Sequence, residues 1–230
     1  MKKISIIIII ICIYASAFGQ MTCSEISEVP ENLIVHDIDG NYYNTIKIGN
    51  QRWMAENLKT TKYADGSEIP MVPDNAAWSA LTNGGYCWYY NDSETHKKTY
   101  GAIYNWYAVV DKRNLCFKGW HIPSDSEWTL LVSYLDGKSV AGGKMKENSI
   151  LHWISPNIGA SNESGFTALP GGDRHDNGPF YDIGYYCYWW SSTEKDATKA
   201  WMYEITNNSP KINRGYFTKN DGFYIRCIMD

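Results

Sequence analysis

The sequence predicts an α+β domain in which antiparallel strands are accompanied by two short helices and joined by long loops. Strand-like segments occur near both ends of the chain, and two segments between them carry apolar residues at helical spacing. Stretches rich in Gly, Asn and Ser separate these segments, and no internal repeat is present. We therefore expect a compact fold whose helices pack beside a sheet, with the first and last strands contributed by the two ends of the chain.

The N-terminus has the pattern of a secretory signal peptide. Lys2 and Lys3 precede an apolar run from Ile4 to Tyr14, and small residues at Ala17 and Gly19 permit cleavage before Gln20. The run is too short for a comfortable membrane span, which disfavours the alternative of an uncleaved anchor. We expect residues 1–19 to be the signal peptide, 20–32 a flexible leader and 33–230 a single domain. The mature chain would carry no transmembrane segment and would reside in the periplasm, on the outer-membrane surface or outside the cell.

Charge and cysteine content narrow the partners and the compartment. The formal charge is −4, and removal of Lys2 and Lys3 leaves 19 basic and 25 acidic residues, or −6. A mildly acidic chain without a basic block disfavours nucleic acid as a partner. Loss of Cys12 leaves five of the six cysteines, an odd number that requires at least one unpaired thiol.

Two turn signals begin the domain. Asp39-Gly40 lies between β-rich runs in "LIVHDIDGNYYNTIKI", and Gly49-Asn50 repeats the device before "QRW". The segment "DIDGN" is also similar to the start of a calcium loop. An EF-hand, however, requires a further oxygen ligand before the glycine and a glutamate at its end. A hairpin turn is therefore the favoured interpretation.

Two helices are predicted in the middle of the chain. Apolar residues at i, i+3, i+4 and i+7 indicate a short helix from about Tyr100 to Val110. A second helix begins after Ser124, because Ser124 and Glu127 form a capping-box pattern. Gly137 is expected to end it.

The segment before this second helix allows an alternative interpretation as a hydrolase site. His121, Ser124, Asp125 and Glu127 are the residue types of a catalytic triad. These residue types, however, also have roles in starting a helix. Ser124 caps the helix, and the carboxylates of Asp125 and Glu127 favour the positive end of its dipole. We therefore favour a helix start over an active site.

The C-terminal half is expected to consist of loops followed by strands. Residues 141–149, 155–165 and 166–184 are rich in turn-forming residues and predict loops. The segments Tyr186–Thr193, Ala200–Ile205 and Gly222–Ile228 are β-like. In the last of these, Phe223, Ile225 and Cys227 would share one face of the strand.

Several longer motifs together carry a family resemblance: "DIDGNYYNTIKIGNQRWMAENLKTTKYADG", "YGAIYNWYAV", "GWHIPSDSEWTLL", "AGGKMKE", "GFTALPGG", "WWSSTE" and "GFYIRCI". From about Val35 to Asp230 the chain resembles the Fibrobacter succinogenes major paralogous domain of secreted and surface proteins of Bacteroidetes and Fibrobacteres. A more distant similarity is to the formylglycine-generating enzymes and the C-type-lectin-like fold. This second resemblance implies a compact α+β domain with its terminal strands in one sheet.

The distant resemblance also has implications for chemistry. Formylglycine-generating enzymes bind copper through two closely spaced cysteines near the C-terminus, whereas Cys227 stands alone here. The Glu-Pro-Asn, Gln-Pro-Asp and Trp-Asn-Asp motifs of calcium-dependent lectins are absent as well. We therefore expect no cofactor, no metal and no catalytic residue. Lectin-like folds commonly tie a cysteine near the helix to the final strand, which implies a Cys116–Cys227 disulfide. Cys87 and Cys187 could pair or remain buried thiols, and Cys23 would be free or intermolecular.

The long loop before the C-terminal strands offers a candidate ligand surface. It brings polar residues close to two tryptophans, and recognition residues favour loops on a rigid scaffold. The alternative is that strand alternation places at least one tryptophan in the core and leaves the loop merely solvated. The candidate ligand-binding residues are Asp173, Arg174, His175, Asp176, Trp189 and Trp190.

We expect a secreted, non-catalytic binding module whose partner is a polysaccharide or another cell-surface component, including a protein. An enzyme related to the formylglycine-generating group, a carboxylate hydrolase and a structural surface protein are the alternatives. Fold resemblance cannot choose among them, since one scaffold hosts many functions.

Overall fold

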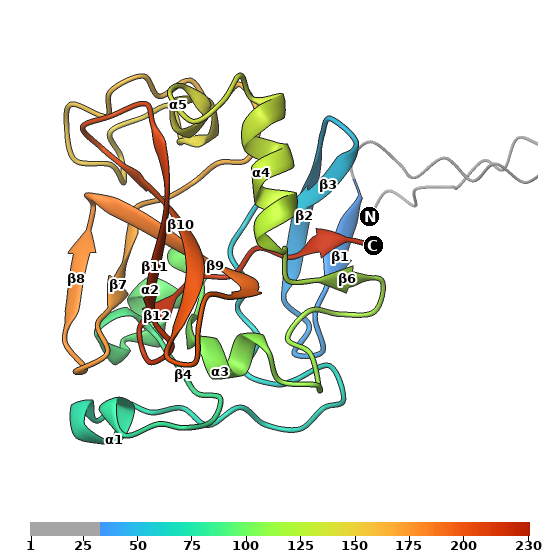
Figure 1. The fold of residues 1–230 in the computed structure, drawn as a ribbon, viewed down its shortest axis with the longest axis vertical. Coiled ribbons are helices and arrows are strands. Elements are labelled where there is room, and N and C mark those ends of the chain that lie inside the picture. The colour runs from blue at the N-terminus through green and yellow to red at the C-terminus, as the bar shows by residue number, and fades with distance from the viewer. Residues whose placement is uncertain (1–32) are drawn as a thin grey trace, which may run out of the picture. The chain divides into compact units, whose positions relative to one another are not determined.

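A computed structural model describes residues 33–230. The predicted signal peptide, the leader and Cys23 lie outside the described residues. Within residues 33–230, no helix is long and apolar enough to cross a bilayer. The described part is a mixed α+β domain, mostly strands with two longer helices, as expected (Figure 1).

The first sheet joins the two ends of the described chain. Its strands follow the order β1-β2-β3-β13-β6, and all its pairs are antiparallel. Ile228 in β13 lies opposite Trp53 in β3 and His121 in β6. The strands are β1 (Ile34–His36), β2 (Tyr42–Ile48), β3 (Gln51–Met54), β6 (Trp120–His121) and β13 (Ile228–Met229). Both predicted hairpin turns are confirmed, because β1, β2 and β3 follow one another with Gly40 and Gly49 at positive φ in the turns.

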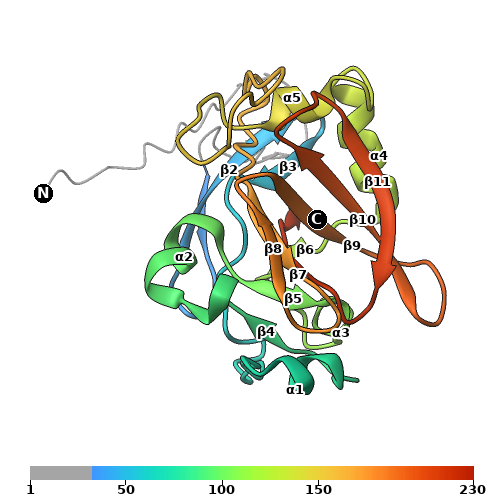
Figure 2. The same ribbon diagram turned by 90° about the vertical axis from the view of Figure 1, so that its left-hand side faces the viewer.

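The second sheet is larger and is assembled from distant segments. Its order is β11-β10-β9-β7-β12-β5-β4, with β8 paired to β7. The β7–β9 pair is parallel and the other pairs are antiparallel (Figure 2). Its strands are β4 (Tyr86–Cys87), β5 (Ile103–Asn105), β7 (Gly171–Arg174), β8 (Phe180–Ile183), β9 (Tyr186–Glu194), β10 (Lys199–Thr206), β11 (Ile212–Thr218) and β12 (Gly222–Phe223).

The two longer helices are α2 (Ser93–Tyr100) and α4 (Asp125–Tyr134). The Ser124 hydroxyl accepts from the Glu127 amide, and the Glu127 carboxylate accepts from the Ser124 amide, so the predicted capping box is confirmed. Trp128 and Leu131 on α4 are buried. The short helical segments are α1 (Asn75–Ser79), the 3₁₀ turn Tyr89–Asn91, α3 (Trp106–Val109) and α5 (Ala141–Met145).

Apolar clusters cover both faces of the second sheet. Tyr188 and Trp190 of β9 enter one cluster, whereas Trp189 enters the other. The last segment alternates in the same way. Phe223, Ile225 and Cys227 belong to the first cluster as predicted, and Tyr224 and Ile228 belong to the second. The sheet therefore lies between two cores, and neighbouring side chains are buried in opposite directions.

Four predictions of secondary structure were wrong in part. The loop predicted at 141–149 contains α5. The helix predicted from Tyr100 to Val110 is instead β5 followed by the single turn of α3, because Gly101 has φ +86° and Asn105 caps α3. The loop predicted at 166–184 contains β7 and β8. The strand predicted from Gly222 to Ile228 divides into β12 and β13, which belong to different sheets. Neither α2 nor β11 was predicted, since both carry mostly polar residues.

Candidate functional site

Arg174, predicted to contact a ligand, lies in β7 and is fully buried. Its guanidinium donates to the carbonyls of Val72, Pro73 and Gly178 and lies 4.4 Å from the Trp78 ring. Arg174 therefore connects β7 to the segment before α1 through buried hydrogen bonds. The segment "GGDR" was predicted to be a polar loop. Its burial was not predicted because two of the carbonyls that accept hydrogen bonds from Arg174 belong to a segment distant in the sequence.

Asp173 is also in β7 and is only 2% exposed. Its Oδ1 has no hydrogen-bond partner among the described residues, and its Oδ2 lies 3.4 Å from His175 Nε2. Burial, together with the charges of Asp182, Asp221 and Glu204, raises the pKa of Asp173 to about 8. Burial therefore favours the protonated form of this carboxyl, which lies beneath the surface.

Trp189 and Trp190 are both 0% exposed. The Trp189 indole donates to Asn57 Oδ1, and the Trp190 indole donates to the Tyr104 carbonyl. The alternative interpretation, in which alternation along the strand buries at least one tryptophan, is confirmed. The second tryptophan is buried as well, because the sheet has a core on each face. Neither ring offers a platform to an external ligand in this structure.

His175 and Asp176 are the two candidates that remain partly exposed. His175 lies against the Tyr181 ring at 4.4 Å between centroids, and Asp176 accepts a hydrogen bond from the Thr218 hydroxyl. The structure thus divides the six candidates: four lie in the interior and two at the edge of the β7–β8 hairpin. It does not bring them together on one surface.

His121 links the start of α4 to the end of the described chain. Its Nε2 lies 2.8 Å from Glu127 Oε1, and its Nδ1 lies 2.6 Å from Asp230 Oδ1. The Glu127 carboxylate also accepts a hydrogen bond from the Ser124 hydroxyl, so it bridges the serine and the histidine. This geometry matches the predicted helix start, in which the serine serves the cap.

The Cys116–Cys227 disulfide implied by the resemblance is present. Cys87 and Cys187 are free thiols, and burial raises the pKa of each to about 12. Among the described residues no group of three or more His, Cys, Asp or Glu is arranged to hold a metal ion.

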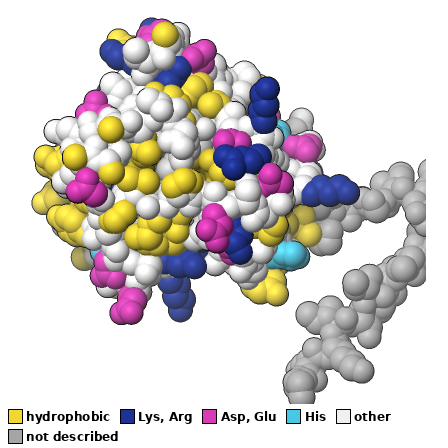
Figure 3. All heavy atoms as spheres, turned by 90° about the horizontal axis from the view of Figure 1, so that it is seen from below, with side chains coloured by type: hydrophobic (Ala, Val, Ile, Leu, Met, Phe, Trp, Pro, Cys, Tyr) yellow, Lys and Arg dark blue, Asp and Glu magenta, His cyan; other side chains and the backbone are white. Residues whose placement is uncertain are grey.

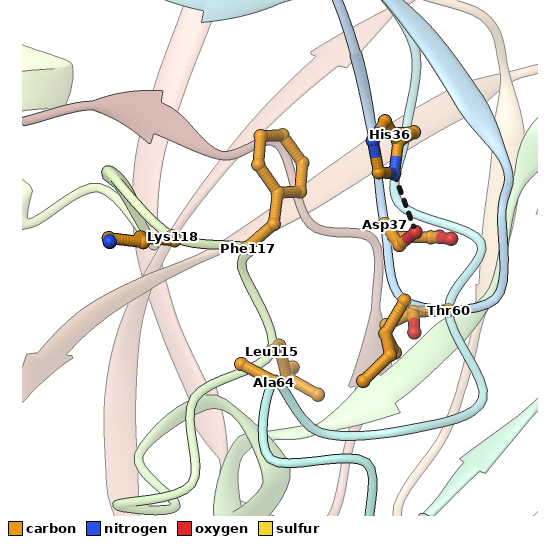
Figure 4. Close-up of a pocket in the computed structure, with 8 residues that line it drawn as sticks. His36, Asp37, Thr60, Ala64, Leu115, Phe117 and Lys118 are labelled. Carbon is orange, nitrogen blue, oxygen red and sulfur yellow. Dashed lines mark hydrogen bonds between the residues drawn. The ribbon is translucent and has the colours of Figure 1, made fainter.

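Two hollows lie at the turn of the β1–β2 hairpin. The first, of about 180 Å³, is here called the apolar hollow. It lies between the turn and the segment on either side of Cys116, and the Lys118 amine points away from it (Figure 4). Its lining residues are His36, Asp37, Ile38, Thr60, Ala64, Leu115, Phe117 and Lys118.

The second, here called the lysine hollow, has a volume of about 350 Å³. It lies between the other side of the turn, the segment after β3, and α2, which runs beside the hairpin (Figure 2). Its lining residues are Gly40, Asn41, Tyr42, Lys59, Ser93, Lys97 and Lys98. Consecutive residues thus serve both hollows, 36–38 on one side and 40–42 on the other.

The turn between the hollows is held rigidly by two aspartates. Asp37 accepts from the backbone and side-chain nitrogens of Asn41 and from the Tyr43 hydroxyl. Asp39 accepts from the amide and hydroxyl of Thr61. These bonds engage the carboxylates within the protein and brace the turn on both sides of Tyr42, a residue that is 71% exposed.

A third surface is apolar. Figure 3 views the domain from the side of α1, where hydrophobic side chains gather across the left and centre of the face. Contiguous apolar surface of this kind is often used for contact between proteins.

The fold and this surface define a single mixed α+β domain, tied by one disulfide and hollowed on both sides of its first hairpin. The chain belongs to the Fibrobacter succinogenes major domain family, whose model matches residues 46–229. No curated protein matches the chain. No solved structure matches it.

Proposed function

We propose that the protein is an exported, non-catalytic binding module that recognises a polysaccharide or another cell-surface component. The main support is the braced hairpin turn, which lies between two hollows and is followed by an exposed tyrosine, Tyr42, that lines the lysine hollow. An exposed ring can stack on the CH groups of a sugar while neighbouring amide and amine groups meet its hydroxyls. Functional residues commonly occupy such loops on rigid scaffolds.

Export and a lectin-like scaffold are part of this proposal. The disulfide favours an oxidising compartment, such as the periplasm or the cell exterior. The pairing of β13 with β3 is the arrangement that the resemblance to lectin-like folds implies. The same disulfide argues against copper chemistry of the formylglycine-generating type, because the Cys227 sulfur is bonded to Cys116.

The apolar face supports a second candidate, a module that docks to a protein of the cell surface. The two candidates predict different ligands and different residues. A polysaccharide would use the hairpin turn, whereas a protein partner would cover the apolar face seen in Figure 3.

Depletion of the full chain by a panel of soluble and insoluble polysaccharides, with and without a chelator, tests the proposal. We expect saturable binding to one class and its loss in Tyr42→Ala. Tyr134→Ala is the matched control, since Tyr134 is an exposed tyrosine on α4 at 64%. Binding to no polysaccharide, or equal binding by both variants, would contradict recognition at the turn.

A further inference from the structure

We propose that the lysine hollow binds an acidic polysaccharide through the carboxylate or sulfate groups of its sugars. This inference rests on the proposed function and gives its ligand a chemical class. It depends on three lysines that the fold gathers from two segments, on the ring and amide beside them, and on the size of the hollow.

The lysines come from elements that are distant in sequence. Lys59 follows β3, whereas Lys97 and Lys98 lie in the last turn of α2. Lys97 and Ser93 are four residues apart, so both project from the same side of the helix. None of the three lysines forms an ion pair with a described carboxylate at 4.0 Å or less.

Aromatic rings hold two of the amines near the hollow. The Lys59 Nζ lies 5.2 Å from the centre of the Tyr43 ring, and the Lys97 Nζ lies 5.3 Å from that of Trp88. Such contacts orient an ammonium group without neutralising it. Each ammonium group therefore keeps its charge and can bind an anion that enters from solvent.

Charges of both signs surround Lys59. Burial lowers the pKa of Lys59; Glu56 and Asp37 oppose this change, while Arg226 and Lys97 add to it. Asp37 is engaged by Asn41 and Tyr43. A bound carboxylate or sulfate would reduce the repulsion between Lys59 and Lys97 and so would bind more tightly than a neutral group.

The remaining lining suits a sugar ring. The exposed face of Tyr42 offers apolar contact, and Asn41 and Ser93 offer polar groups for hydroxyls. The volume of about 350 Å³ falls at the lower end of small-molecule sites, roughly 300–1,000 Å³. Lysines act as point charges rather than planar forks, which suits acidic groups that vary in orientation along a chain.

The test compares polygalacturonate, dextran sulfate and neutral dextran as ligands of the full chain. The variant Lys59→Gln/Lys97→Gln/Lys98→Gln removes the charges of the hollow. Its control, Lys47→Gln/Lys112→Gln/Lys138→Gln, removes the same charge from exposed lysines elsewhere. Thermal unfolding of each variant establishes that it is folded before binding is measured.

We expect wild type to bind at least one acidic polymer about tenfold more tightly than dextran, and to lose affinity as salt rises. The hollow variant should lose about tenfold in affinity, and the control should stay within about twofold. A preference for polygalacturonate or for dextran sulfate would identify carboxylate or sulfate as the recognised group.

Two other results overturn the inference in distinguishable ways. Equal loss in both triple variants, or tight binding of dextran that the hollow variant retains, would exclude the lysine hollow as an anion site while leaving a binding module intact. Binding to no acidic polymer here and to no member of the wider polysaccharide panel would overturn the proposed polysaccharide module together with the inference.

Discussion

The Arg226 guanidinium lies over the Phe166 ring, with 4.2 Å between its central carbon and the ring centroid. It also donates to the Phe166 and Thr167 carbonyls, to the Met54 carbonyl and to Asn57 Oδ1. Burial lowers the pKa of Arg226 to about 10, so it remains charged at neutral pH. One buried cation thus satisfies the Met54 carbonyl at the end of β3, two adjacent carbonyls at Phe166 and Thr167, and the side-chain oxygen of Asn57.

Replacing Arg226 with Met should therefore destabilise the domain strongly. The substitution leaves several buried oxygens without donors, and we expect the free energy of unfolding to fall by about 3 kcal/mol. Urea denaturation measures the change. Arg113→Met is the control, because the Arg113–Asp111 ion pair is 42% and 22% exposed and should contribute about 1 kcal/mol or less. Equal losses in the two variants would contradict this assignment.

The buried Asp173 should make stability decrease as pH rises. Its pKa is raised to about 8 in the folded protein and is about 3.9 in an unfolded chain. Between these values the folded state binds the extra proton, so the stability that this carboxyl contributes is fully present below about pH 4 and is lost progressively up to pH 8. Asp173→Asn should flatten this dependence. Its free energy of unfolding, relative to that of wild type, should rise by up to about 1.4 kcal/mol per pH unit across this range.

Urea denaturation of Asp173→Asn at pH 5, 6, 7 and 8 tests this dependence. The part-exposed Asp176 supplies the control variant, Asp176→Asn, which should follow the wild-type curve more closely. Parallel curves for wild type and Asp173→Asn would show that Asp173 is ionised in the folded state.

His121 should titrate above its ordinary pKa. Burial opposes its protonation, but hydrogen bonds and charge from Asp230 and Glu127 outweigh burial and raise the pKa of His121. The stabilisation is fully present below about pH 6.5 and is lost as pH rises through the folded pKa. An NMR titration should show the raised value in wild type and a lower one in Asp230→Asn. Asp196→Asn, an exposed carboxylate elsewhere, should leave the titration unchanged.

The four described cysteines should behave in two different ways: Cys116 and Cys227 as a disulfide, and Cys87 and Cys187 as buried free thiols. Non-reducing peptide mapping should recover Cys116 joined to Cys227, and Ala at both positions should cost up to about 4–5 kcal/mol, since 111 residues separate them. Iodoacetamide should leave Cys87 and Cys187 unmodified until urea unfolds the chain, because both thiols are buried with raised pKa values. Rapid labelling of Cys87 or Cys187 in the native protein would contradict their burial.

Local signals in the sequence predicted local structure well. The Asp39-Gly40 turn and the Ser124 capping box involve neighbours in the chain, so their residue types alone indicate the geometry. The burial of Arg174 was not predictable in this way, because its acceptors include the carbonyls of Val72 and Pro73, about a hundred residues earlier. A polar run was therefore interpreted as a solvated loop.

The same limitation applies to the candidate site. The lysine hollow joins residues 40–42, a lysine after β3 and two lysines of α2, none of which forms a charge run in the sequence. Trp189 and Trp190 illustrate the converse error. Aromatic residues beside a polar segment suggested a sugar platform, whereas a sheet with two cores buries both rings.

The position of β13 between β3 and β6 in the first sheet has a consequence for how the protein is made. Trp53 in β3 pairs with Ile46 on one side, but its partner on the other side is Ile228, 175 positions later in the chain, and β6 pairs with the same strand as that partner. The ribosome therefore releases nearly all of the domain before the sheet can close. Until then the β3 edge stays unpaired, which leaves the growing polypeptide open to edge-to-edge pairing with strands of other chains.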